Sequence, residues 1–480
     1  MICSDRHIKS GKRTEPAWGI LLVKALMAVL AALLFTGTVS AQSTFGTILG
    51  TVKDAAANVL PHAAVSLSNR GTSASRTAIA DPTGNYSFNN LEPGSYQLFV
   101  EAPGFEKAQI ETLDLQARET KRVDVQLKVS TQTESINVVE SGGAVIETDV
   151  SNIAETKTGR ELVDLPIAIT SHSTGSTSPI TTLTTQPGVQ TDSAGNISVS
   201  GTKPSLLSIS VDGISTMAIN GSSPINELFP AFSSIAEIRV SEVNNSAEYG
   251  GITDITTVSK AGTNAYHGGL FENHENAALN AGNPFAKSKP ALVMNDFGGF
   301  FGGPLSIPHL YNGHNRTFFF VSYEGLRLPR QVPVVESVPT DDMRNGNLCG
   351  YLASKNIAHI YQPNGTEIPC GSVPITPVAA NVLQYLFPHA TDQTKFANNY
   401  QQNFAAPISS DQGDIRIDQV LTSKQTIWAR GTYKLRSVLG PATSSGNFSG
   451  SPVLGSYSTP EQDIGFTVAY NYVITPTLIN

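Results

Sequence analysis

A strict two-residue alternation of side chains near the C-terminus limits what this chain can fold into. Apolar residues occupy every second position, namely Ile464, Phe466, Val468, Tyr470 and Tyr472. The residues between them are polar or small, namely Asp463, Gly465, Thr467, Ala469 and Asn471. A similar alternation runs over residues 427–436. This period belongs to β-strands with two unlike faces, which occur both in membrane β-barrels and in soluble two-sheet sandwiches.

Composition excludes several classes of protein. Only 15% of the 480 residues are charged, whereas Gly (41) and Pro (28) are plentiful, which favours strands, turns and loops over helices. The net charge of −8 argues against a nucleic-acid partner. No apolar run beyond residue 41 reaches the ~18 residues of a membrane helix, so soluble sandwiches and membrane barrels remain.

The N-terminus has the layout of an export signal. Basic residues precede an apolar stretch at 25–35, and small residues at 39–41 follow it. This order predicts a secretory signal peptide over residues 1–41, cleaved after Ala41. A single membrane anchor is the alternative, but the apolar stretch is about half as long as a spanning helix requires.

Two cysteines remain after that cleavage. Cys349 and Cys370 would lie in an oxidising compartment, where free thiols are disfavoured, so they form a candidate disulfide. Closing this loop would stabilise the fold by about 3 kcal/mol in the chain-entropy model. Two separate thiols are the other interpretation.

Residues 43–129 have the pattern of a small antiparallel β-sandwich, with turn signals about every ten residues. The expected strands span 47–52, 64–68, 86–91, 96–101 and 122–127. The segment also contains Gly-Thr-Val-Lys-Asp (50–54), Gly-Asn-Tyr-Ser-Phe (84–88), Leu-Glu-Pro-Gly-Ser-Tyr (91–96) and Ala-Pro-Gly-Phe (102–105). These motifs resemble the carboxypeptidase regulatory-like domain. The resemblance implies a transthyretin-like, carbohydrate-binding-like sandwich that serves as an accessory module without catalysis.

Residues 130–264 consist of short strands and loops rich in Gly, Ser and Thr. Six motifs follow one another in order: Gln-Pro-Gly-Val (186–189), Ile-Ser-Val-Ser-Gly (197–201), Val-Asp-Gly-Ile (211–214), Ala-Glu-Ile-Arg-Val (236–240), Ala-Glu-Tyr-Gly (247–250) and Ser-Lys-Ala-Gly-Thr-Asn (259–264). Together they resemble the small mixed plug domain of TonB-dependent outer-membrane receptors. Within it, Asp212-Gly213 is expected to form a tight turn between two strands.

Residues 265–480 continue that resemblance into a barrel. The motifs at 264–268, 297–304 and 318–325 are similar to the opening strands of Oar-like TonB-dependent receptors, and a long loop follows that holds both cysteines. The fold class expected is therefore mostly β, ending in the first part of an antiparallel transmembrane β-barrel. Plugged barrels have about 22 strands, and 265–480 can supply fewer than half of them, so we expect an N-terminal fragment.

The resemblance also implies a segment before the plug on which the inner-membrane TonB complex pulls. The candidate is the extended run Ser135, Ile136, Asn137, Val138 and Val139, because an exposed strand can add an edge to a partner. A plain linker strand leading into the plug explains the same residues.

The sequence contains no catalytic or cofactor motif. It lacks a His-Glu-x-x-His zinc motif, a Gly-x-Ser-x-Gly elbow and a Walker phosphate loop, so we expect no enzyme, no metal and no cofactor. The resemblance implies an outer-membrane receptor with its sandwich in the periplasm. It would contact lipid, bind an unknown surface ligand, with glycans among the candidates, and import it. A secreted or surface-attached β-rich carbohydrate-binding or adhesion protein is the alternative.

Overall fold

The computed structural model describes most of the chain beyond the expected signal peptide. The described residues are 43–130, 136–138, 153–164, 179–191, 196–218, 224–225, 228–245, 251–282, 284, 288–441, 456–475 and 478–479. In this part of the chain no helix is both long and apolar enough to cross a bilayer. The expected signal peptide lies outside the described residues.

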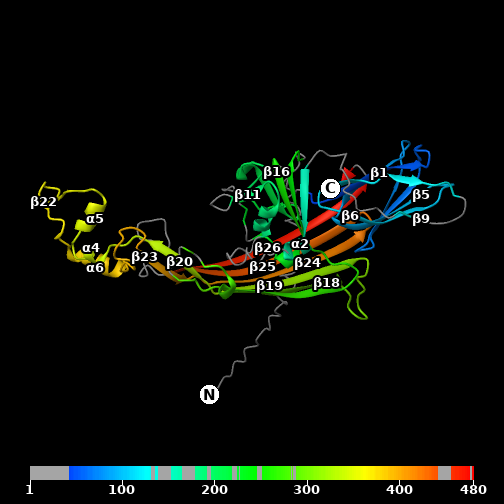
Figure 1. Cartoon of the computed structure of the whole chain (residues 1–480). Coiled ribbons are helices and arrows are strands. Elements are labelled where there is room, and N and C mark those ends of the chain that lie inside the picture. Colours follow the sequence, from blue (N-terminus) through cyan, green and yellow to red (C-terminus); the bar gives the residue numbers. More distant parts are fainter. Residues whose placement is uncertain are drawn as a thin grey trace, which may run out of the picture. The chain divides into compact units, whose positions relative to one another are not determined.

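Two sheets form the N-terminal sandwich (Figure 1). One contains β4-β1-β7, with β8 also on β1, and the other has the order β3-β2-β5-β6-β9. Their bounds are β1 (Gly46–Asp54), β2 (Ala64–Asn69), β3 (Ser75–Ile79), β4 (Asn85–Leu91), β5 (Gly94–Glu101), β6 (Ala108–Leu115), β7 (Thr120–Arg122), β8 (Val125–Leu127) and β9 (Ile136–Val138). An apolar core that includes Ile48, Phe88, Leu98 and Leu113 fills the space between the sheets.

Four of the five expected sandwich strands are confirmed to within two residues, as β1, β2, β4 and β5. The fifth, at 122–127, is wrong as a single strand, because β7 and β8 pair with β1 separately. Between them, the Asp124 side chain accepts the Thr51 N–H at 2.8 Å in place of a backbone oxygen. A Cβ on Gly50 would lie 1.8 Å from the Val123 carbonyl oxygen, so only glycine allows this close approach.

The middle segment, here called the plug domain, is built on a mixed sheet with the order β10-β15-β16-β13-β14. Its bounds are β10 (Ile153–Thr158), β13 (Leu207–Val211), β14 (Ile214–Ser215), β15 (Ile235–Val243) and β16 (Thr253–Ser259), with α2 (Gly159–Asp164), η1 (Pro179–Thr185), η2 (Pro204–Leu206), η4 (Phe232–Ser234) and the β11 (Val189–Thr191)–β12 (Ile197–Val199) hairpin around it. The expected tight turn is confirmed, since Asp212 and Gly213 join β13 to β14 with φ values of 49° and 82°.

A seven-stranded sheet, here called the barrel sheet, follows in the order β17-β18-β19-β24-β25-β26-β27. Figure 1 shows β18, β19, β24, β25 and β26 lying side by side. Their bounds are β17 (His267–Asn276), β18 (Val293–Pro304), β19 (Thr317–Leu328), β24 (Ile408–Thr422), β25 (Gln425–Pro441), β26 (Ser456–Thr475) and β27 (Leu478–Ile479), with η6 (Ala277–Leu279) after β17. Every pair in this sheet is antiparallel.

The long loop expected around the two cysteines is a folded lobe, residues 329–407, inserted between β19 and β24. Its elements are β20 (Gln331–Glu336), α4 (Asp341–Arg344), α5 (Cys349–Ser354), β21 (Ile360–Tyr361), β22 (Glu367–Ile368), α6 (Pro377–Leu386) and β23 (Tyr400–Ala405). β20 pairs with β23, so both ends of the lobe leave the barrel sheet together.

Candidate functional site

The inward face of the barrel sheet is polar and buried. Its members are Ser322, Glu324, Gln412, Asp414, Arg416, Arg430, Thr432 and Lys434. On the opposite face of β26, Ile464 is 73% and Phe466 75% exposed. Burial therefore confirms the expected alternation and gives its direction, with the polar side chains inward.

A loop of the plug domain, residues 229–234, is bonded to this polar face. The Asp414 carboxylate accepts hydrogen bonds from the Ala231 N–H at 3.0 Å and from the Ser234 hydroxyl at 3.1 Å. The Gln412 side-chain amide donates to the Phe229 carbonyl at 3.0 Å. Backbone groups that a loop would otherwise leave unpaired are thus satisfied by the barrel sheet.

The β13–β14 turn provides the second attachment. Its buried Asp212 carboxylate lies 3.2 Å from the Arg430 Nε atom on β25 and 3.8 Å from the Arg416 Nη1 atom on β24. Arg416 also donates to the Ser259 hydroxyl of the plug at 2.9 Å and pairs with Asp418 on its own strand at 2.7 Å. One plug carboxylate is therefore held by two barrel arginines, and removal of Asp212 would leave the Arg430 guanidinium buried without this carboxylate.

The sandwich is bonded to the plug sheet by the turn at 116–119. Ala117 is fully buried there, and its N–H donates to the Glu237 carboxylate on β15 at 2.5 Å. The Arg118 guanidinium pairs with Asp254 on β16, with side chains only 2% and 1% exposed. Arg239 adds a hydrogen bond to the Gln116 side chain at 2.8 Å.

Burial of Glu237 in this junction raises the pKa of its carboxyl group to about 7. The Ala117 N–H and the nearby Arg239 both oppose the shift, and the Glu119 carboxylate adds to it. Desolvation is the largest cause because it disfavours the charged form. The Glu237 carboxyl group therefore gains or loses its proton within the physiological pH range.

The expected coupling segment lies only partly in the described residues. Ile136, Asn137 and Val138 form β9, and Ser135 and Val139 lie outside the described part. β9 runs parallel to β6, with Ile136 opposite Ala108 and Val138 opposite Ile110. The segment is thus an outermost strand of the sandwich sheet.

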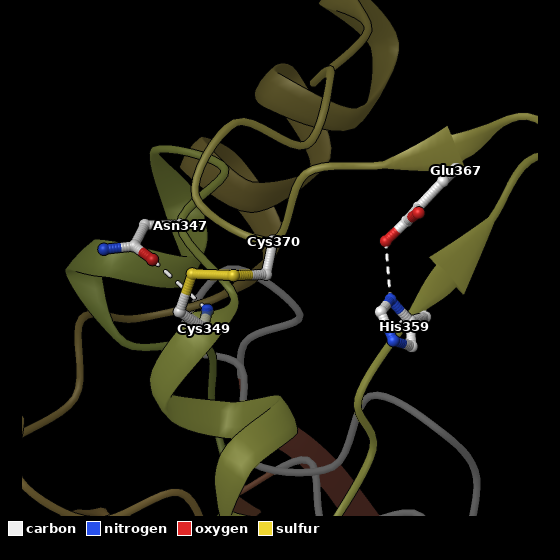
Figure 2. The surroundings of a disulfide bond; sticks show 5 residues. All are labelled: Asn347, Cys349, His359, Glu367 and Cys370. Atoms are coloured by element: carbon white, nitrogen blue, oxygen red, sulfur yellow. Dashed lines mark hydrogen bonds and ion pairs between the residues drawn. A yellow bond between two sulfur atoms is a disulfide. The ribbon is translucent and has the colours of Figure 1, made fainter.

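The two cysteines lie in the lobe. Figure 2 shows the disulfide that joins Cys349 at the start of α5 to Cys370, with Cα atoms 4.8 Å apart. Nearby, the exposed His359 ring lies 2.6 Å from the Glu367 carboxylate across the β21–β22 pair. Arg344 fastens the lobe further by donating to the Phe387 carbonyl at 2.6 Å. The lobe is therefore held together by a covalent bond, by polar contacts and by a small apolar cluster of Val338, Ala390 and Tyr400.

The aromatic residues that could stack on sugar are mostly used in packing. Tyr86 is buried, and its hydroxyl donates to the Val123 carbonyl at 2.6 Å. Phe105 packs against the sandwich core, and Phe99 is half-buried. Among the described residues, no three His, Cys, Asp or Glu side chains gather as metal ligands.

Two family models match the chain. The "Carboxypeptidase regulatory-like domain" matches residues 47–128, and the "Outer membrane beta barrel domain" matches residues 258–480. A curated relative, the TonB-dependent transporter Oar of Myxococcus xanthus, is 27% identical over 301 residues. The chain is similar to the Oar-like group of TonB-dependent outer-membrane proteins. Its barrel sheet is accordingly placed in the outer membrane.

The alignment with that relative covers 58% of this chain and 27% of the relative, so the chain spans about a quarter of the relative's length. Among solved structures, the chain is similar to a mutant of the ferric enterobactin receptor of Pseudomonas aeruginosa. The match covers 66% of this chain and 38% of the receptor chain, at 12% identity and a TM-score of 0.39. The match to a catechol 1,2-dioxygenase of Acinetobacter covers 25% of this chain and 74% of the dioxygenase chain, at 14% identity and a TM-score of 0.16. Neither score is high enough to support an argument.

Sequence reasoning alone does not find the partners within the site. Asp212 stands out in the sequence only as a turn residue, and Arg416 only as one polar residue in a strand. The signal that was available is the charge on the inward positions 430, 434 and 436, which predicts a polar partner for that face. The Gln116–Glu119 junction has no such signal, because it depends on how two domains pack.

Proposed function

We propose that this chain acts in an outer-membrane receptor that binds a ligand at the cell surface and imports it with energy from the inner membrane. The observation that carries the proposal is the buried polar attachment of the plug domain to the inward face of the barrel sheet. A wall that is apolar outside and bonded to a plug inside is suited to gated passage rather than catalysis. β9 is the proposed coupling segment for TonB.

The lengths of the connections between strands support one orientation of the barrel sheet in the membrane. The β24–β25 turn consists of residues 423–424, whereas the lobe fills 329–407 at the opposite end of β24. Outer-membrane barrels have short periplasmic turns and longer extracellular loops. The lobe therefore faces outward, and the sandwich, whose Glu92 accepts a hydrogen bond from Thr426 next to the short turn, lies in the periplasm.

The alternative is a surface-attached adhesion protein that transports nothing. In such a soluble sandwich the apolar row on β26 would be packed inside, but here Phe466 is exposed and Thr467 is buried. Heat-modifiable gel migration of the complete gene product separates the two proposals, because only a closed barrel resists detergent until it is boiled. Migration that heating leaves unchanged would favour the adhesion protein.

The coupling segment is tested by Val138→Pro in the complete gene product. Proline removes a backbone donor from this three-residue strand and disfavours strand pairing, so binding of the purified periplasmic domain of TonB should fall at least about tenfold. Val145→Pro, in the segment that follows, is the matched control and should bind normally. Normal binding by Val138→Pro would reject β9 as the coupling segment.

A further inference from the structure

β9 pairs with the sandwich along one edge, and no described strand pairs with its other edge. It lies last in the order β3-β2-β5-β6-β9, and within the described residues its outer edge has no strand partner. The other edge follows β6 in parallel register from Ala108–Ile136 to Ile110–Val138. A strand that is already extended and ordered loses less conformational entropy on accepting a new neighbour than a free segment does.

β6 connects this edge directly to the plug. The strand ends at Leu115, and the next residues form the buried turn in which Ala117 bonds to Glu237 and Arg118 pairs with Asp254. β9 therefore lies beside a strand whose far end is fixed in the plug sheet. Its covalent route to the plug is longer, through residues 139–152.

We infer that the partner's strand adds to the outer edge of β9 while β9 remains paired with β6, so that the partner extends the sandwich sheet. This inference rests on β9 being the coupling segment. It assigns the sandwich a role in the coupling, since a pull on the partner strand reaches the plug through β6 and the 116–119 turn. The competing possibility is that β9 must leave β6 before the partner can bind.

A covalent staple between β9 and β6 distinguishes the two routes. The double variant Gln109→Cys with Asn137→Cys places a cysteine pair at facing positions of the two strands. The complete receptor is purified in oxidised and reduced forms, and its affinity for the periplasmic domain of TonB is measured. The inference predicts affinities within about twofold of each other. A loss of at least about tenfold in the oxidised form alone would overturn it.

Two controls make the result specific. Ser66→Cys with Thr77→Cys staples β2 to β3 on the far side of the same sheet. The unmodified receptor in the same redox buffers accounts for the Cys349–Cys370 bond. If the first pair does not oxidise, Ala108→Cys with Ile136→Cys replaces it. Failure of both pairs to form, checked by mass spectrometry, would contradict the pairing of β9 with β6.

The outcomes also separate this inference from the proposed function. If Val138→Pro binds the partner normally, β9 is not the coupling segment and both proposals fail. A second outcome is that Val138→Pro loses binding and that the double-cysteine variant loses binding in its oxidised form but not in its reduced form. In that case β9 is the coupling segment, but it must leave β6 before the partner binds. Equal binding by both redox forms, together with loss in Val138→Pro, supports both.

Discussion

The sandwich and the barrel sheet share the same two-residue alternation, but their apolar side chains point in opposite directions. In the sandwich, the apolar side chains Phe88 and Leu98 point into a closed core. In the barrel sheet, Phe466 and its neighbours on β26 point outward, and polar residues such as Lys434 are buried. The period therefore identifies a strand with two faces, whereas the solvent on each side decides which face is apolar. The two regions can be tested against each other by substitution.

The largest expected effect is in the sandwich core. Phe88→Ala removes a fully buried ring and should lower the free energy of unfolding of the sandwich by about 3–5 kcal/mol. Phe466→Ala is the matched control, because its ring faces lipid and leaves no cavity. Protease resistance of the sandwich in urea, followed in the complete receptor, measures the difference. Equal losses in the two variants would remove the distinction between the two regions.

A charge on the outward face should have the next largest effect. Phe466 lies near the middle of β26, so Phe466→Arg should destabilise the folded barrel by about 2–4 kcal/mol, as charges do at the bilayer midplane. Ser458→Arg, close to the end of the same strand, should cost less than about 1 kcal/mol. Urea unfolding in lipid vesicles measures both. An outward face that tolerates arginine at 466 would not be in lipid.

The inward face should depend on its polar partners. Asp212→Ala leaves the Arg430 guanidinium buried without its plug carboxylate and should cost about 1.5–3 kcal/mol. Glu101→Ala breaks the exposed pair with Lys107 and should cost less than about 1 kcal/mol. Thermal unfolding of the complete receptor compares them. A neutral Asp212→Ala variant would mean that the plug is not held by this ion pair.

The last prediction concerns the pH dependence of stability at the sandwich–plug junction. The pKa of Glu237 is raised from 4.5 to about 7, so the folded state holds a proton there that the unfolded state releases. This contribution to stability is greatest below pH 4.5 and is lost as the pH rises to about 7. The melting temperature should therefore fall from pH 5 to pH 8 more in the wild type than in Glu237→Gln. Parallel pH profiles would contradict this.

Local pattern predicts much of this fold because strand period and turn chemistry are local properties. It gives β1, β2, β4 and β5, the Asp212-Gly213 turn and both faces of β26. It misses β6, in which a bulge puts Ile110 and Leu113 on one face although they are three residues apart. It also misses β3, the helices of the lobe and the pairing of β9 with β6, because these depend on contacts between distant segments.

The barrel sheet faces lipid with its apolar side and the plug domain with its polar side. A fluorophore attached to single cysteines along β26, in the complete receptor in vesicles with brominated lipid, tests this arrangement most directly. Labels at 464, 466, 468 and 470 should be quenched, and labels at 463, 465, 467 and 469 should not. Quenching that does not alternate along the strand, or that alternates in the opposite sense, would contradict the claim.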